Sequence, residues 1–494
     1  MKRAAKWALA NRMAGQLLQF LGTIVTARLL LPEDYGKAAV IFPVTTFAAI
    51  FTSLGLGSAV AYSRRVTEEL LSTAFWLNAV AGVVMGGVVV ALAVPLSALF
   101  REPELVPLLA LSSLTFVLNL SVVHLGLMER VLRFKKIAVI EITCTVLNIA
   151  TIIATAAAGA GAYALVLGPI VSAVSTTLFM WVAVRWLPRR RPDLASLREL
   201  FRYTRGVTGF SMLNFWSRNA DNLLLARFVS QTELGLYSRS YNVMRLPVTQ
   251  MNTMMGRVLF PAMTRLRDDR KRLGRAWLTA LSTAATLTAP VTLGMAVAAP
   301  AMVEVLYGTR WLGMVPVLQI LAVSALPQIL TTTVASLLRA TGATGLLFRV
   351  GVATASMSLV AICIGLPWGT VGVATALLVK FYLEVLVTFR FALRQTGLRA
   401  RDILGALWGV AVACLALAGV GVLVRLNLEA AAWQVLLAQM AACGATYLAV
   451  LALLDRRPLA QAWGILGRSS GSSGTREEMP DAARQDAPTA GTVG

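Results

Sequence analysis

The feature that most constrains this chain is a succession of long apolar segments joined by short connections. A helix needs about 20 mostly apolar residues to cross the hydrocarbon core of a bilayer. Fourteen segments of that kind follow one another: 10–31, 37–58, 70–99, 105–127, 137–158, 162–186, 206–230, 234–260, 275–299, 313–337, 345–366, 370–393, 403–425 and 432–454. Only 14% of the 494 residues are charged, whereas a soluble domain carries about 25%. The sequence therefore predicts an all-α membrane protein with about fourteen transmembrane helices.

Basic residues gather in alternate connections between these segments. The pair 64–65 and the runs 130–136, 189–205 and 265–275 are rich in Lys and Arg, whereas the connection 158–161 contains none. Cytoplasmic loops of membrane proteins carry such an excess of Lys and Arg. With fourteen crossings, the basic clusters and both termini fall on one side. We therefore expect a multi-pass protein of the bacterial cytoplasmic (inner) membrane with both termini in the cytoplasm.

The two ends of the chain need separate interpretation. The start, Met1-Lys2-Arg3, resembles the basic region of a signal peptide. The apolar segment after it runs to about Leu31 without a small-residue cleavage site, so we expect it to remain as the first spanning helix. From Ser469 the chain is rich in Ser and Gly and then in charge. Such a composition cannot form a core, and residues 466–494 are predicted to be a disordered cytoplasmic tail.

The formal net charge of +22 suits contact with anionic membrane lipids. A nucleic-acid-binding surface would need a basic stripe interleaved with exposed aromatic residues. The sequence has no such stripe, because its basic residues lie in short clusters between apolar segments. We therefore expect no nucleic-acid partner.

An internal repeat divides the chain into related blocks. Its pattern is an Arg, an acid six residues later and a Gly eight residues later. The pattern occurs at Arg28, Asp34 and Gly36 and, 199 residues further on, at Arg227, Glu233 and Gly235. A second echo relates Gly161 to Gly372. The repeat predicts two parallel six-helix lobes, residues 1–190 and 200–396, followed by two helices within 400–465. Two such lobes around a cavity are typical of alternating-access transporters.

Three of the predicted helices carry polar stripes. A charged side chain at the bilayer centre costs roughly 2.5–3.5 kcal/mol on insertion scales, and steps of three and four residues keep side chains on one helical face. The residues predicted to line a substrate cavity are Arg12, Gln16 and Gln19, then Asn214, Arg218, Asp221 and Asn222, then Arg239, Asn242 and Arg245. Arg outnumbers Asp among them, and the planar Arg fork can bond two phosphate oxygens. We expect the cavity to bind an anion; the alternative is that Arg218 and Asp221 only pair and hold helices together.

Other polar residues have competing interpretations. His124, the only histidine, is interpreted as a packing residue rather than a proton relay. Glu141, and Lys380 with Glu384, are candidate coupling sites, although Lys380 and Glu384 lie four residues apart and could simply pair. The sequence lacks a nucleophile elbow, a Walker loop, paired Cys/His spacing and an acidic metal cluster. We therefore expect no enzyme activity, no catalytic residue, no metal and no cofactor.

Several short strings carry a family resemblance. They are Arg218-Asn219-Ala220-Asp221-Asn222, Leu234-Gly235-Leu236-Tyr237, Glu304-Val305-Leu306-Tyr307-Gly308 and Leu338-Arg339-Ala340-Thr341-Gly342. Over roughly residues 5–455 the chain resembles the polysaccharide-transporter flippases of the multidrug/oligosaccharidyl-lipid/polysaccharide superfamily, in the branch named after the colanic-acid exporter. The resemblance implies fourteen helices and a substrate built on undecaprenyl pyrophosphate. The expected function is to move a lipid-linked oligosaccharide across the membrane for cell-surface polysaccharide biosynthesis, with a polymerase and export machinery as further partners.

Three alternative functions remain open at this point. A lipid II flippase would belong to the same superfamily. A cation-coupled drug exporter should have an acid in the first helix, where this chain has Gln16 and Gln19. A membrane glycan polymerase would need a large extracytoplasmic loop or an acid/His pair, and neither is visible.

Overall fold

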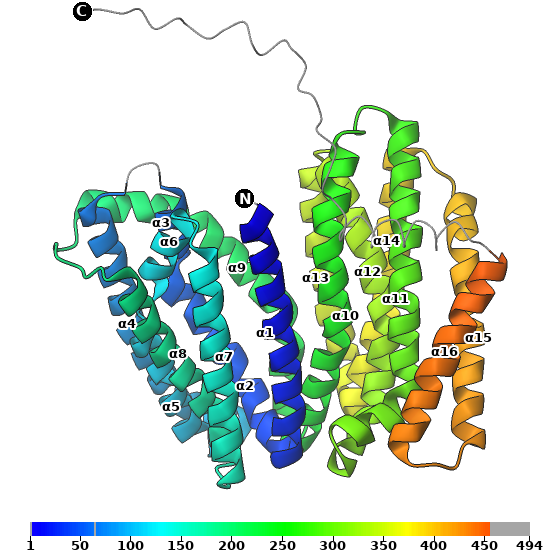
Figure 1. Cartoon of the computed structure of the whole chain (residues 1–494), viewed down its shortest axis with the longest axis horizontal. Coiled ribbons are helices and arrows are strands. Elements are labelled where there is room, and N and C mark those ends of the chain that lie inside the picture. Colours follow the sequence, from blue (N-terminus) through cyan, green and yellow to red (C-terminus); the bar gives the residue numbers. More distant parts are fainter. Residues whose placement is uncertain (1, 64–65, 455–494) are drawn as a thin grey trace, which may run out of the picture.

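The computed structural model describes residues 2–63 and 66–454, in which all regular structure is helical (Figure 1). The first half of the chain forms α1 (Lys2–Leu29), α2 (Pro32–Ser53), α3 (Leu56–Tyr62), α4 (Glu68–Phe100), α5 (Leu105–Leu118), α6 (Val122–Arg130), α7 (Phe134–Ala157) and α8 (Ala162–Val184). The second half forms α9 (Leu194–Phe228), α10 (Gln231–Thr264), α11 (Arg270–Leu306), η1 (Thr309–Met314), α12 (Val315–Ala340), α13 (Thr344–Gly365), η2 (Leu366–Trp368), α14 (Gly369–Thr396), α15 (Ala400–Asn427) and α16 (Ala432–Leu454). The predicted tail, 466–494, lies outside the described residues.

The predicted all-α membrane fold is confirmed. Each apolar segment coincides with one helix or with two consecutive helices. Among the described residues, nine helical stretches are long and apolar enough to span a membrane, or ten if the bent pair α5–α6 is one span. The polar-striped helices α1, α9 and α10 are not among them. The number of fourteen crossings therefore stays a prediction.

Two predicted segments are each divided into two helices. α2 ends where Leu54 and Gly55 adopt φ values of 43° and 66°, and a left-handed residue of this kind ends a right-handed helix. In the segment 105–127, α5 ends at Leu118 and α6 begins at Val122, with a bend of 42° between them. Hydrophobic length alone could not reveal these breaks, because the residues on both sides remain apolar.

The helices pack as two bundles with extra helices at one side (Figure 1). In the first half α4 packs on α5 and α7 packs on both α1 and α8; in the second half α12 packs on α10, α11 and α14. α9 contacts α2, α3 and α4 as well as α10 and α13, so it bridges the bundles. α15 and α16 pair and cover α11, where the Tyr447 hydroxyl donates to the Thr286 carbonyl at 2.9 Å. The predicted lobe boundaries stay predictions.

The surface and the core are divided as a bilayer requires. Large exposed side chains on the outer helices are apolar, as at Val83 on α4 and Leu415 on α15, which are 60% and 75% exposed. Three large aromatic residues, Tyr237, Trp277 and Trp311, are instead fully buried between helices. An extensive apolar exterior of this kind is the surface that lipid chains solvate.

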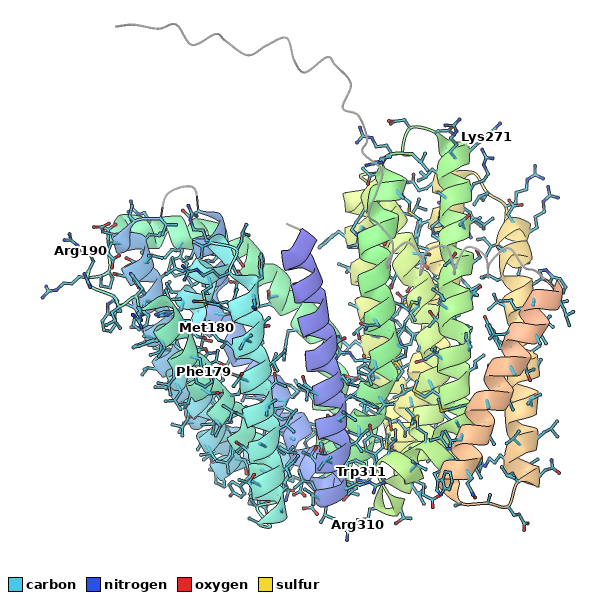
Figure 2. All side chains as sticks on the ribbon, in the orientation of Figure 1. Phe179, Met180, Arg190, Lys271, Arg310 and Trp311 are labelled. Atoms are coloured by element: carbon cyan, nitrogen blue, oxygen red, sulfur yellow. The ribbon has the colours of Figure 1, made fainter. Side chains whose placement is uncertain are left out.

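The two ends of the bundle differ in charge and in packing. Figure 2 shows Arg190 and Lys271 at one end, here called the basic end, and Arg310 and Trp311 at the opposite end, here called the Trp311 end. The N-terminus of α1 points toward the basic end (Figure 1). This arrangement agrees with the alternation of basic connections along the sequence.

The two halves join near the Trp311 end. The Trp311 indole Nε1–H donates to the Ala27 carbonyl at 2.8 Å, and the Arg28 guanidinium donates to the carbonyls of Val305 and Leu306. These bonds tie the last turn of α1 to the end of α11 and to η1. α2 and α10 also pack closely on each other, while their axes diverge toward the basic end (Figure 1).

Candidate functional site

The first candidate site lies between the two halves, where α1 faces α10. A cavity of about 350 Å³ is lined by Gln16 and Gln19 from α1 and by Arg239 and Asn242 from α10. The Gln250 amide reaches the Gln16 carbonyl oxygen at 3.4 Å. Four residues that the polar stripes predicted thus come together, two from each half of the chain. The helical period is what places them there, because the stripe of each helix turns toward the other.

Arg239 is fixed by aromatic rings from both halves. Its guanidinium carbon lies 4.6 Å from the centroid of the Tyr35 ring and 5.7 Å from that of Tyr307. Its Nη2 donates to the Thr23 carbonyl at 3.4 Å. Cations over aromatic faces are stabilised by the ring quadrupole. Arg239 therefore contributes both a positive charge to the cavity and a contact that holds α10 against α1 and α2.

A second cavity lies inside the second half, between α10, α12, α13 and α14. It has a volume of about 270 Å³, and its charged lining residues are Arg245 and Lys380. The Lys380 ammonium pairs with the Glu384 carboxylate at 2.5 Å, as the four-residue spacing suggested. The Arg245 guanidinium lies 5.9 Å from the Tyr241 ring centroid and has no ion pair among the described residues. Arg245 therefore brings to this cavity a positive charge that has no ion pair among the described residues.

Two further cavities lie in the first half. One, of about 600 Å³, lies beside α1, α7 and α8. Gln16 and Gln19 line both this cavity and the α1–α10 cavity. Glu129 and Glu141 also line it and are acidic. The other, of about 370 Å³, lies between α2, α5, α7 and α8. Ser172 and Thr176 line both of these cavities. The shared lining makes the three cavities neighbours along one path from the first lobe to the α1–α10 junction.

The other five residues predicted to line the cavity are not seen in it. They either line none of the cavities or have side chains outside the described residues. Asp221 is only 6% exposed; it accepts a hydrogen bond from the Tyr237 hydroxyl at 3.2 Å and lines none of the cavities described here. Asn222 follows it, with its backbone N–H donating to the Asp221 carboxylate at 2.8 Å. The side chains of Arg12, Asn214 and Arg218 lie outside the described residues. The cavity roles of these five residues stay predictions.

His124 occupies the packed position that the sequence analysis favoured. It is fully buried, it stacks on Trp181 with ring centroids 5.4 Å apart, and its Nε2 lies 3.0 Å from the Trp186 carbonyl. The cavity that Lys380 shares with Arg245 was not predicted from the sequence. The internal repeat could have predicted it. Gly372 lies 211 residues after Gly161, and the same step relates Pro169, which lines the first-lobe cavity, to Lys380.

Comparison with known proteins gives the family. Residues 25–316, more than half of the chain, match the family described as polysaccharide biosynthesis protein. The chain belongs to this family. The lipopolysaccharide biosynthesis protein WzxC of Escherichia coli (strain K12) is 27% identical over 82% of this chain and 83% of its own length. The succinoglycan biosynthesis transport protein ExoT of Rhizobium meliloti (strain 1021) is 29% identical over 65% of each chain. The match confirms the resemblance predicted from the sequence.

A solved structure shares the fold of this polysaccharide biosynthesis family member. The lipid II flippase MurJ, in an inward closed conformation, is similar with a TM-score of 0.72 over 93% of this chain and 100% of that chain, at 14% sequence identity. At so low a sequence identity, the structural similarity shows a common fold. The chain thus shares the fold of that membrane protein and is itself a multi-pass membrane protein, in agreement with the apolar helices and the two-bundle packing.

Proposed function

We propose that the protein is a flippase that moves a lipid-linked oligosaccharide, carried on undecaprenyl pyrophosphate, across the bacterial cytoplasmic membrane by alternating access. The observation that carries the proposal is the cavity between α1 and α10, where Arg239 and neutral amides from both halves meet, in a member of the polysaccharide biosynthesis family. The names of WzxC and ExoT support a role in polysaccharide biosynthesis and transport. The delivered oligosaccharide would then be extended by a polymerase and passed to export machinery.

The charge of the site suits a diphosphate. Arg239 and Arg245 lie six residues apart on α10. Arg239 lines the α1–α10 cavity and Arg245 lines the neighbouring second-lobe cavity. A guanidinium can donate two parallel hydrogen bonds to phosphate oxygens, and in a site of low dielectric such charge-assisted bonds are strong. Gln16, Gln19 and Asn242 add amide donors without adding negative charge. The site therefore favours an anionic group bearing polar substituents.

The orientation follows from the charge of the two ends. The basic end is assigned to the cytoplasm by the positive-inside rule, which also places both termini there. The halves are joined at the Trp311 end and diverge toward the basic end (Figure 1). This conformation would admit substrate from the cytoplasmic leaflet, where a sugar-lipid precursor is made. Reopening at the Trp311 end would release it on the opposite side.

The alternatives have less support. A drug exporter that binds cations would place an acid where α1 presents Gln16 and Gln19 to the cavities. A lipid II flippase shares the fold, but the family match is to polysaccharide biosynthesis proteins. A membrane polymerase would need a reactive acid/base pair at the cavity between the halves, where Arg239 is the one charged residue of the described lining.

The test is complementation of a strain from which the gene has been deleted. Surface polysaccharide should be lost in the deletion strain, and lipid-linked oligosaccharide should accumulate in the inner leaflet. Arg245→Gln should restore less than a tenth of the surface polysaccharide at equal protein level, because the cavity loses the guanidinium that would bind the diphosphate. Arg339→Gln is the matched control, since Arg339 is exposed and, among the described residues, its side chain donates only to the Ala335 carbonyl of its own helix. Unaltered surface polysaccharide in the deletion strain would refute the proposed function.

A further inference from the structure

The contact between α2 and α10 reveals which residues of the two lobes are equivalent. A Cβ atom placed on Gly36 would lie 1.8 Å from the Gln231 carbonyl oxygen, and one placed on Gly235 would lie 1.8 Å from the Pro32 carbonyl oxygen. Gly235 is 199 residues after Gly36, and Gln231 is 199 residues after Pro32. The two glycine contacts are therefore the same contact seen from each side, as a twofold axis through the crossing requires. The step of 199 residues relates α2 to α10 in space as well as in sequence.

The same step relates two cavities. Phe42 and Thr46 of α2 line the first-lobe cavity of about 370 Å³, and their equivalents Tyr241 and Arg245 line the second-lobe cavity of about 270 Å³. Thr46 and Arg245 each lie ten residues beyond their glycine, which is about 15 Å along a helix with a rise of 1.5 Å per residue. The two cavities thus lie at the same level on either side of the crossing.

The chemistry of these matching cavities differs. In the second lobe the equivalents of Thr46 and Pro169 are the cations Arg245 and Lys380. The polar side chains that line the first-lobe cavity carry hydroxyl and amide groups, the rest of its lining is apolar, and it has no Asp, Glu, Lys or Arg among its described lining residues. A diphosphate gains strong charge-assisted bonds beside Arg245 and would find none beside Thr46. A neutral, hydroxyl-rich group has the opposite preference.

Several polar groups in the first-lobe cavity are free to bind. Thr46, Asn148, Ser172 and Thr176 line it, and the side chains of these four residues have no hydrogen bond to any other described residue. Polar groups without partners inside a membrane protein are costly, so such a cluster is arranged for water or for a polar ligand. A sugar offers many hydroxyl groups that both donate and accept, which complements this lining.

The cavities are also placed to hold two parts of one molecule. Ser172 and Thr176 connect the first-lobe cavity to the cavity beside α1, and Gln16 and Gln19 connect that cavity to the α1–α10 cavity with Arg239. On α10, Asn242 of the α1–α10 cavity lies three residues before Arg245, so the two share a helical face. Polar side chains therefore extend from the hydroxyl-lined cavity to the cationic one.

We infer that the first-lobe cavity is the glycan subsite, with Thr46, Asn148, Ser172 and Thr176 binding sugar hydroxyls, while the second-lobe cavity with Arg245 holds the diphosphate of the same molecule. The inference rests on the proposed function and adds a division of the substrate between the lobes. It predicts that the glycan and the diphosphate contribute separately to affinity and that substitutions in one lobe remove one contribution only.

The experiment measures binding to the full-length protein in lipid nanodiscs with two probes. One probe is undecaprenyl diphosphate without sugar, and the other is the lipid-linked oligosaccharide fraction extracted from the deletion strain. Wild-type protein should bind the second probe at least tenfold more tightly than the first. The double variant Thr46→Val and Ser172→Ala, which removes two hydroxyls with little change of shape, should lose that tenfold difference and keep its affinity for undecaprenyl diphosphate. Arg245→Gln should lower the affinity for both probes by a similar factor.

The control and the contrary outcomes are distinct. Thr143→Val is the matched control, because Thr143 lies on α7 in the same lobe, is exposed, and lines none of these cavities. A double variant that keeps the full preference for the glycan-bearing probe would overturn the glycan subsite while leaving the proposed function intact. Wild-type protein that binds neither probe would instead refute the proposed function, and the glycan subsite with it.

Discussion

At the scale of single residues, the arginines of α10 perform different tasks although they share a helix. Arg239 lies over Tyr35 and Tyr307 and reaches the Thr23 carbonyl, so its loss would weaken the junction between the halves as well as the charge. The Arg245 guanidinium lies over the Tyr241 ring within α10 itself, so Arg245 is the cleaner probe of charge. Arg218 is predicted from its stripe to add a third guanidinium on α9.

Arg218→Ala should abolish polysaccharide export while the protein still inserts and accumulates, because the cavity loses a predicted phosphate-binding group. Arg218→Lys should retain only part of the export, since an ammonium keeps the charge but not the two-pronged geometry. Surface polysaccharide and protein level are measured in the deletion strain. Asp221→Asn separates the two interpretations: equal loss of protein in Arg218→Ala and Asp221→Asn would mean that the two residues only hold helices together.

The pair of Lys380 and Glu384 gives a second prediction at this scale. Their side chains are only 6% and 13% exposed, and removing one partner of a buried ion pair costs about 3–5 kcal/mol because the other charge is left uncompensated. Glu384→Gln should therefore lower the thermal stability of the purified protein strongly. The double variant Lys380→Met with Glu384→Gln should recover most of the loss. A double variant that is less stable than Glu384→Gln alone would contradict this account.

At the scale of helices, the crossing of α2 and α10 governs closure of the Trp311 end. Both helices have a glycine at the point of contact, with the partner backbone where a Cβ would stand. A side chain at either position forces the backbones apart, since backbone atoms cannot move aside as a flexible side chain can. The crossing can form only with glycine at both positions.

Gly36→Ala should therefore hold the Trp311 end open and reduce transport at least tenfold. Thr26→Cys, in a protein whose four cysteines have been replaced, reports the change, because Thr26 is 5% exposed near this end. Its rate of reaction with an impermeant maleimide should rise several-fold in the Gly36→Ala background. Gly87→Ala is the control, since a Cβ there meets nothing within 4 Å. An unchanged labelling rate would show that the crossing tolerates a side chain.

The sequence predicted some of these features and not others, for physical reasons. Apolar length and helical period are local properties of the sequence. They therefore predicted where the helices lie and which helix faces carry Gln16, Gln19 and Arg239, which line one cavity. The break at Leu54 depends on a left-handed residue that hydropathy does not register. The burial of Asp221 against Tyr237 depends on which way α9 turns between its neighbours. A polar stripe predicts which face of a helix is polar, whereas the packing of the helices determines what that face contacts.

At the scale of the whole molecule, the charge of the two ends predicts the orientation in the membrane. Cysteines introduced at Lys135, Arg198 and Arg270 should react only with reagents that reach the cytoplasm. Cysteines at Arg101 and Arg310 should react from outside, because both positions are exposed at the opposite side from the basic clusters. The physical reason is the excess of Lys and Arg at the basic end. Labelling of position 198 from outside intact cells would refute the fourteen-crossing topology.

The glycine crossing has a consequence for the history of the chain. Duplication and fusion of one gene produces this kind of internal equivalence, and in an ancestral homodimer the two glycines would have been one residue facing its own copy. Every mutation in such a homodimer appears twice, so a new arginine would have entered both halves at once. After fusion, each half could mutate alone. Position 46 could then remain a threonine while position 245 became an arginine. A protein descended from a symmetric dimer could thereby come to bind an asymmetric substrate in one preferred orientation.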